Sequence, residues 1–409
     1  MTNVQSQSAG HLHGKEIDSA RRATWRWPSV TVSVPEKSLV EFCGVRKPRY
    51  GDLALCQVET VGANTFIENS VGCNMSIFPG TVLLGAFAPR YAMDEFEGAI
   101  PESIYSGQRV ALLNRGGTIG EVVSMNSHYK DPTMLKVLSF LKDSEGRVAN
   151  LKNFGKPGST IPTTSRKTGR KLIVVVGTAM NSGKSSTAKA ITYALTASGE
   201  QVVAAKATGQ GCRRDVLLMK AAGASHTVDF MDFGYPSTYL LPKEEVSDLF
   251  WKIYNDLHEK AGPDGYMVIE FADGIYQRET SMLLSDPLIK KQISSLVFSC
   301  CDSLSAVAGV EALRTRFGLE TTAISGPCAN SDLGLREVTQ FLGDFPAFNN
   351  MVMDVPHIVQ ILGDRMSHKR VAIESSVPVR RIDIEPEVSL QPDITPEINA
   401  QPMLANSER

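Results

Sequence analysis

The chain has 409 residues, with 42 Lys+Arg against 44 Asp+Glu and a formal net charge of −2. This balance excludes a protein that coats nucleic acid by charge alone, so we expect no nucleic-acid partner. No apolar run reaches the roughly 18 residues of a membrane span, and the polar N-terminus has no apolar signal-peptide core. Seven scattered cysteines without a CxxC motif indicate reduced thiols and a cytoplasmic protein.

The composition divides the chain into five parts. Residues 1–38 are polar and are expected to form a mobile lead. Residues 39–150 contain short apolar runs between glycine-rich turns, which predicts a small all-β barrel or sandwich. Residues 151–170 are rich in Gly, Pro, Ser, Thr and Lys and are expected to be a linker. Residues 171–364 form the main domain, and the Pro- and acid-rich residues 365–409 are expected to be disordered.

The main domain is predicted to have an α/β fold with a doubly wound, mostly parallel sheet. Its all-apolar runs alternate with helical stretches, which is typical of parallel strands covered on both faces. Strands are expected at residues 172–176, 202–205, 267–269, 296–299 and 321–325, and helices at 184–197, 214–222, 243–259 and 305–316.

The strongest motif is the run LIVVVGTAMNSGKSSTAKAI, in which an apolar strand leads through a glycine-containing turn into a helix. Glycines let the backbone N–H groups approach phosphate oxygens, and the helix N-terminus adds a positive dipole end. Lys184 is expected to reach the β- and γ-phosphates, and the Ser185 hydroxyl to ligate Mg²⁺. The usual motif has four residues between its first Gly and the Gly-Lys pair, whereas this chain has five. The predicted nucleotide-binding residues, here called the phosphate loop, are Gly177, Thr178, Ala179, Met180, Asn181, Ser182, Gly183, Lys184, Ser185 and Ser186.

The longer loop resembles that of dethiobiotin synthetase and the related cobyrinic-acid amide ligases, a branch of the P-loop proteins. The likeness covers about residues 171–340. It implies ATP or another nucleoside triphosphate with Mg²⁺, a catalytic role for Lys206 beside Lys184, and metal binding by Asp215 and Glu270 together with Ser185. It also implies that the Tyr235-Pro236-Ser237-Thr238 stretch is a loop on the substrate side.

Each of these residues also has an ordinary structural interpretation. Lys206 could be a plain strand-end lysine, and Asp215 a first-turn acid favoured by the helix dipole. Glu270 follows an apolar strand, where an unpaired carboxylate is costly, so a functional role is favoured. Asp273 is a rival for the metal, and Phe271 and Asp273 replace small residues of the family. The substrate-side candidates are Thr208, Gln210, Arg213, Pro236, Ser237 and Asp273.

Three functions remain open from the sequence. The first is an ATP-dependent ligase-like enzyme that phosphorylates a carboxylate or carbamate of a small molecule before C–N bond formation or cyclisation. The second is a small-molecule kinase or an N-acyltransferase, since the region also resembles a family said to include a D-amino-acid N-acyltransferase. The third is a nucleotide-switched binding module whose partner-binding part is the β domain. By analogy with other β-barrels appended to ATPases, we also expect a homodimer or higher homo-oligomer.

Overall fold

The computed structural model describes residues 15–16, 24–35, 39–162 and 169–367. The strands of the N-terminal half and those of the C-terminal half form separate main sheets. Residues 39–150 are here called the barrel part, and residues 171–367 are called the α/β part. Among the described residues, no helix is both long and apolar enough to cross a bilayer. All seven cysteines are free thiols.

The barrel part is built from short strands whose ladder closes on itself. Strand β12 pairs with both β10 and β4, and the ring runs β12–β10–β11–β7–β4 and back to β12. Every pairing in this ring is antiparallel except β11 with β7. The strands are β2 (Val40–Phe42), β3 (Val45–Arg46), β4 (Leu53–Thr60), β5 (Phe66–Glu68), β6 (Asn74–Ser76), β7 (Val82–Phe87), β8 (Phe96–Ala99), β9 (Ile104–Tyr105), β10 (Arg109–Leu112), β11 (Thr118–Met125) and β12 (Thr133–Lys142), and β1 (Lys15–Glu16) pairs with β2. Because this ring of strands closes on itself, the structure has the barrel rather than the sandwich. Closure leaves no unpaired strand edge within the ring.

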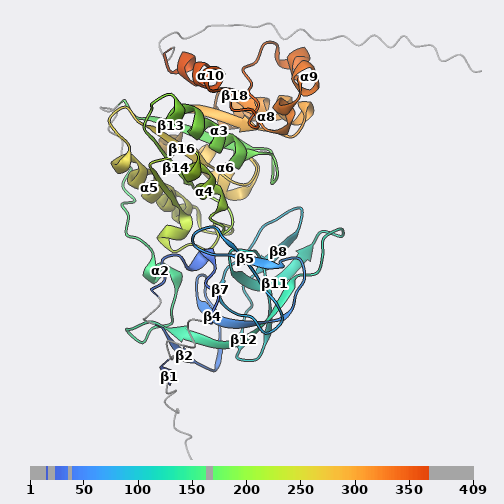
Figure 1. The fold of residues 1–409 in the computed structure, drawn as a ribbon, viewed down its shortest axis with the longest axis vertical. Coiled ribbons are helices and arrows are strands. Elements are labelled where there is room, and N and C mark those ends of the chain that lie inside the picture. The colour runs from blue at the N-terminus through green and yellow to red at the C-terminus, as the bar shows by residue number, and fades with distance from the viewer. Residues whose placement is uncertain (1–14, 17–23, 36–38, 163–168, 368–409) are drawn as a thin grey trace, which may run out of the picture. The chain divides into compact units, whose positions relative to one another are not determined.

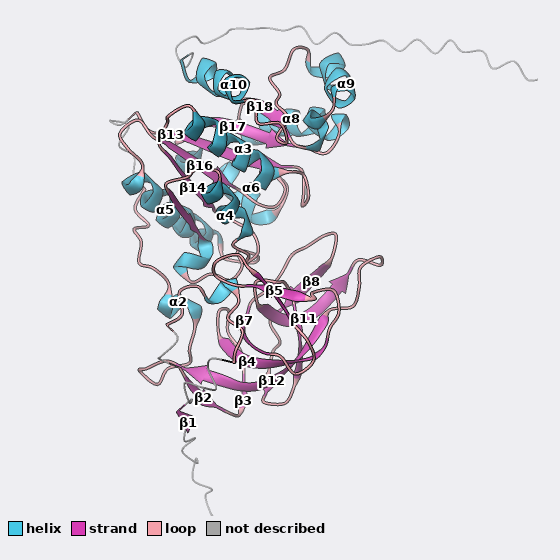
Figure 2. Cartoon of the chain, viewed as in Figure 1, coloured by secondary structure: helices cyan, strands magenta, loops and turns pink. Residues whose placement is uncertain are grey.

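The α/β part contains a six-stranded parallel sheet in the order β15–β14–β16–β13–β17–β18 (Figure 2). The strands are β13 (Lys171–Gly177), β14 (Val202–Lys206), β15 (His226–Asp229), β16 (Tyr266–Glu270), β17 (Ile293–Ser299) and β18 (Ala323–Ser325). The helices are α3 (Lys184–Ala197), α4 (Arg214–Ala221), α5 (Lys243–Lys260), α6 (Arg278–Ser285), α7 (Pro287–Lys290), α8 (Ser303–Phe317), α9 (Asp332–Leu342) and α10 (Val355–Ser367). The predicted α/β class and its five strands are therefore confirmed, and β15 is an additional strand.

The side chains of β13 alternate between two buried faces of the sheet, which explains why residues 172–176 are all apolar. Val174 and Val176 face a core that includes side chains of α5, α6 and α8, whereas Ile173 and Val175 face α3, α4 and α10. Helices on both faces bury the strand completely, which satisfies the physical requirement of a parallel sheet. The central strand β13 thus ends between β16 and β17 and delivers the phosphate loop to the middle of the sheet edge (Figure 1).

Two expectations about connecting segments are corrected. Trp25 and Val30 of the expected mobile lead are buried in a core that also contains Leu53 and Phe230, and Ser29–Thr31 form a short 3-10 helix, η1. The expected linker begins with α2 (Leu151–Phe154), and Gly155 and Gly158 after it lie against the α/β part. Residues 1–14, 17–23, 36–38, 163–168 and 368–409, including most of the expected disordered tail, lie outside the described residues.

Candidate nucleotide site

The phosphate loop turns its carbonyl groups toward the protein. The Ser299 hydroxyl donates to the Ser182 carbonyl at 2.6 Å, and the Asn350 amide donates to the Gly183 carbonyl at 3.2 Å. Lys184 Nζ donates to the Ala179 carbonyl at 2.6 Å. These contacts hold the loop from its inner side and leave the opposite face to its N–H groups.

The N–H face of the loop has the properties of an anion site. Within the described part of the chain, no acceptor contacts the amide N–H groups of residues 179–186. Gly183 has φ +89°, a left-handed conformation that a residue with a Cβ rarely adopts, at the first turn of α3. Several unpaired N–H groups at a helix N-terminus bind phosphate oxygens readily. The N–H face of the loop is therefore open to an anion.

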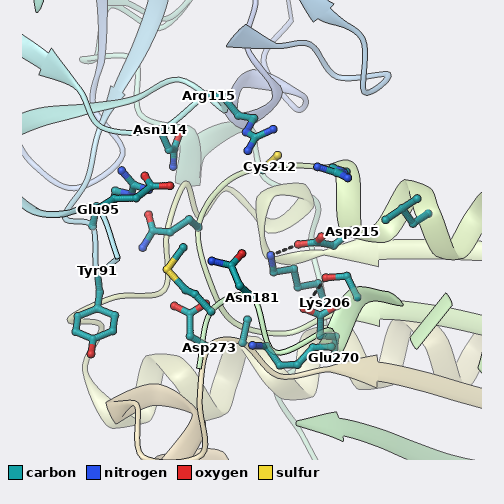
Figure 3. A pocket seen from close by; sticks show the side chains of 18 of the residues that line it. Tyr91, Glu95, Asn114, Arg115, Asn181, Lys206, Cys212, Asp215, Glu270 and Asp273 are labelled. Carbon is teal, nitrogen blue, oxygen red and sulfur yellow. Dashed lines mark hydrogen bonds and ion pairs between the residues drawn. The ribbon is translucent and has the colours of Figure 1, made fainter. Parts of the chain in front are cut away.

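The charged side chains predicted for the site lie close together around this loop (Figure 3). The Ser185 hydroxyl donates to Glu270 Oε1 at 3.2 Å. Lys206, at the end of β14, forms an ion pair with Asp215 in the first turn of α4. Lys184 is buried at the start of α3. The parallel sheet brings these residues together because strands β13, β14 and β16 all end at the same edge.

Burial and neighbouring charges set the protonation of these groups. Burial, together with the Asp215 charge, raises the pKa of Glu270 to about 7, although Lys206 and Lys184 oppose the rise. Burial acts against the Asp215 carboxylate as well, but the Lys206 ammonium holds the pKa of Asp215 below its usual value. Burial lowers the pKa of Lys184, against the attraction of Asp273 and Glu270.

A magnesium ion fits this donor set. The Glu270 carboxylate is among the most buried charged groups in the described part of the molecule. Its Oε2 atom nevertheless has no hydrogen-bond partner among the described residues. Ser185 and Asp215 supply the neighbouring oxygen atoms, and hard oxygen ligands completed by water are what Mg²⁺ prefers. No group of three or more His, Cys, Asp or Glu side chains in the described chain could hold a metal alone, so bound phosphate and water would complete the shell.

A cavity of about 590 Å³ opens over the loop, and both parts of the chain line it. From the α/β part come Met180, Asn181, Gly183, Lys184, Ser185, Ser186, Lys206, Gln210, Cys212, Arg214, Asp215, Leu218, Glu270, Ala272 and Asp273. From the barrel part come Ala63, Asn64, Phe66, Arg90, Tyr91, Glu95, Asn114, Arg115 and Tyr129. Figure 3 shows Asn114, Arg115 and Glu95 across the cavity from Asn181, Lys206 and Glu270.

The predicted substrate-side residues divide into two groups. Gln210 and Asp273 line the cavity, and burial raises the pKa of Asp273. Thr208 is buried and exchanges hydrogen bonds with the backbone of Ala272. Arg213, Pro236 and Ser237 do not line the cavity either: Arg213 pairs with Asp232, the Pro236 carbonyl accepts from Gly211, and Ser237 contacts Tyr50.

The sequence did not reveal that the barrel part holds the helix carrying Asp215. The Glu68 carboxylate accepts from the Arg213 backbone N–H at 2.6 Å and from the Cys212 thiol at 2.8 Å, directly before α4. Burial, with the Glu68 charge, raises the pKa of Cys212 to about 12, so the thiol stays protonated and donates. A Cβ on Gly116 would lie 1.5 Å from the Gly211 carbonyl, which shows how closely the two backbones approach. No local pattern could have indicated a contact between residues 145 positions apart.

A buried carboxyl group beside this helix gives the first prediction. Burial, reinforced by Asp232, raises the pKa of Asp229 to about 7 against the attraction of Arg213. Between about pH 4 and pH 7 the folded state then holds a proton that the unfolded state has lost, so stability falls as pH rises. Asp229→Asn should remove this contribution and flatten the slope of unfolding free energy by up to ~1.4 kcal/mol per pH unit in that window. Urea unfolding at several pH values measures the slope, with the exposed Asp344→Asn as the control; an unchanged slope in Asp229→Asn would contradict the assignment.

Comparisons with known proteins show only a weak similarity, in sequence and in structure. No family model and no curated protein matches the chain. Among solved structures, the signal recognition particle 54 kDa protein of Aeropyrum pernix K1 in complex with GDP is 15% identical over 53% of this chain and 52% of its own, with a TM-score of 0.34. The signal recognition particle receptor FtsY of Elizabethkingia anophelis in complex with GDP is 15% identical over 54% and 70%, with a TM-score of 0.33. The cell division protein FtsY of Thermotoga maritima is 14% identical over 52% and 74%, with a TM-score of 0.32.

The match spans about half the length of the first of these structures. The likeness is too low to assign a ligand or an activity, so the α/β class rests on the sheet and loop described above. The resemblance to dethiobiotin synthetase stays a prediction from the sequence.

Proposed function

We propose that the chain binds a nucleoside triphosphate with Mg²⁺ at the phosphate loop and that the nucleotide state controls the contact between the α/β part and the barrel part. The unpaired N–H groups of residues 179–186 and the buried Lys184 support phosphate binding. Ser185, Asp215 and Glu270 would hold the metal, which supplies charge neutralisation along the phosphate chain.

The observation that supports the switch is a series of contacts that leads from the phosphate loop to Glu68. Asp215 interacts with Ser185 of the loop and pairs with Lys206, and it sits in the first turn of α4. Glu68 of the barrel part binds the backbone directly before that turn. Asn181 of the loop also donates to Asp94 of the barrel part at 3.1 Å. A change in charge beside Asp215 therefore acts on residues that the barrel part contacts.

The γ-phosphate supplies the difference between the two nucleotide states. Without it, the Lys206 ammonium pairs, among the described residues, with the Asp215 carboxylate. A terminal phosphate would compete for the Lys206 ammonium, while Mg²⁺ would favour the freed Asp215 oxygens. A ligand shifts an equilibrium only through such differential contacts, and the diphosphate lacks them.

Glu68→Gln tests this function. In the wild type, hydrogen exchange of residues 61–77 and 113–118 should differ between the Mg²⁺–ATP-analogue and Mg²⁺–ADP states. The variant loses the charge that holds the start of α4, so the difference should largely disappear while nucleotide affinity changes by less than about threefold. Glu59→Gln is the matched control, because Glu59 pairs with Arg109 at the exposed surface. Identical exchange in both nucleotide states of the wild type would refute the switch.

A second candidate is phosphoryl transfer to a small molecule, as in a ligase or kinase. The size of the cavity favours it, because the space extends past the phosphate loop to the barrel part. Release of ADP that depends on an added small molecule, with little turnover in its absence, would favour this candidate over the switch.

A further inference from the structure

The barrel half of the cavity has a charge pattern that the nucleotide does not explain. Two cations of the lining have a carboxylate partner: Lys206 pairs with Asp215, and Arg90 pairs with Glu95. A third cation, Lys184, belongs to the phosphate loop. Arg115 and Arg214 also line the cavity, but neither forms an ion pair within the described residues. Outside the phosphate loop, two cations without an ion-pair partner among the described residues therefore face the same space.

We propose that this half of the cavity binds a small organic carboxylate, held by Arg115, as a second ligand beside the nucleotide. The placement of the nucleotide rests on the proposed function; the carboxylate site rests on the barrel wall itself. The wall consists of Ala63, Asn64, Phe66, Arg115 and Tyr129, with Arg214 contributed by α4, and is here called the carboxylate pocket.

Arg115 is arranged to present its guanidinium group. It is half-buried in the turn between β10 and β11, and its guanidinium carbon lies 5.4 Å from the centre of the Phe66 ring. Its backbone carbonyl accepts from the Glu68 N–H at 2.8 Å, which fixes the main chain. A guanidinium that is stacked on a ring keeps its N–H groups free in one plane, and that fork matches the two oxygens of a carboxylate. Arg90 offers no such fork, because Glu95 and the Leu113 carbonyl already accept from its two terminal nitrogens.

The surroundings of Arg115 favour an organic acid over a bare inorganic anion. Phe66, Tyr129 and Ala63 give the pocket an apolar side against which a carbon skeleton can pack. Gln210 Oε1 is a buried acceptor without a hydrogen-bond partner among the described residues. The Gln210 amide N–H group donates to Ser237 at 3.2 Å, which orients the side chain. An unsatisfied buried acceptor in a cavity wall suits a ligand that also carries an N–H or O–H donor.

Glu68 links the barrel side of the carboxylate pocket to the start of α4, which contributes Arg214. Its backbone N–H binds the Arg115 carbonyl, and its carboxylate binds the Arg213 N–H next to Arg214. The Gly116 turn lies directly against Gly211, so the Arg115 backbone and the loop before α4 lie close together. The pocket is thus preformed by the same contact that positions Asp215.

Calorimetric titration of the full-length protein tests the inference. Acetate, lactate, succinate and benzoate are titrated singly, with inorganic phosphate as the comparison, both with and without Mg²⁺ and a non-hydrolysable ATP analogue. At least one carboxylate should bind. Arg115→Gln should weaken it about tenfold or more, and Arg115→Lys should give an intermediate loss because it keeps the charge but not the fork. Arg109→Gln is the control, since Arg109 is an exposed arginine of the barrel part outside the cavity.

Three results would overturn the inference: no carboxylate binds the wild type, Arg115→Gln binds it unchanged, or phosphate binds as well as every carboxylate. Titration of the nucleotide alone separates this inference from the proposed function. Carboxylate binding that depends on Arg115 in a protein that binds no nucleotide would uphold the pocket and refute the proposed function. Nucleotide binding without any carboxylate binding would support the nucleotide site and refute the carboxylate pocket.

Discussion

Lys184→Ala should abolish nucleotide binding at micromolar concentrations, with an affinity loss of about 100-fold or more. Lys184 is the buried cation of the phosphate loop, and its ammonium bridges the loop to the Ala179 carbonyl. The variant loses a charge-assisted contact to the phosphates and also the brace that keeps the loop open. Fluorescence titration with a labelled ATP analogue in the presence of Mg²⁺ measures the change.

The control for this variant is Lys189→Ala, which removes a lysine of the same helix that does not line the cavity. It should bind nucleotide like the wild type. Thermal unfolding without nucleotide shows whether Lys184→Ala is folded, and Lys184→Gln, which retains a hydrogen-bond donor, provides a milder substitution. If both Lys184 variants are folded and bind normally, the loop is not a phosphate site and the proposed function is wrong.

Glu270→Gln should reduce nucleoside triphosphate turnover by about 100-fold or more while changing nucleotide affinity by less than about tenfold. Glu270 is buried at the end of β16, and its Oε2 atom has no hydrogen-bond partner among the described residues. The amide keeps the size of the side chain but removes the negative charge that Mg²⁺ requires there. Phosphate release at saturating nucleotide and increasing Mg²⁺ concentration separates weaker metal binding from slower chemistry.

Asp273→Asn is the matched comparison, because Asp273 lines the same cavity and was the rival for the metal. No described hydrogen bond joins Asp273 to Ser185, whereas Glu270 accepts from the Ser185 hydroxyl. We therefore expect the smaller loss of turnover in Asp273→Asn. The reverse order would move the metal from Glu270 to Asp273.

The phosphate loop and the ends of the strands beside it could be predicted because their residues follow each other in local patterns. An apolar strand, a turn with Gly183 and a helix beginning at Lys184 form one continuous stretch, and Lys206 and Glu270 each end an apolar run. Parallel strands then bring these ends to one edge. Strand β15 was missed because its sequence, HTVD, has little apolar content and lies at the edge of the sheet.

The barrel half of the cavity could not be predicted because tertiary packing alone creates it. Glu68 and Arg213 carry no motif, and only the folded chain brings them together. The linker was misinterpreted for a related reason. The Gly- and Pro-rich composition of residues 151–170 predicts a linker, but Gly155 and Gly158 both lie against Phe233, where the absence of a side chain permits close packing. Composition does not distinguish a small residue that confers flexibility from one that fits a narrow space.

The shared core of the two parts limits how they can move. Buried side chains from the N-terminal segment, the barrel part and the α/β part form one continuous apolar cluster, including Trp25, Leu84, Leu151 and Phe230. A rigid-body hinge would have to break that cluster and expose it to water, at a large cost in free energy. Conformational signalling in this molecule should therefore take the form of small displacements of the loops around Glu68, and global unfolding should be a single cooperative event.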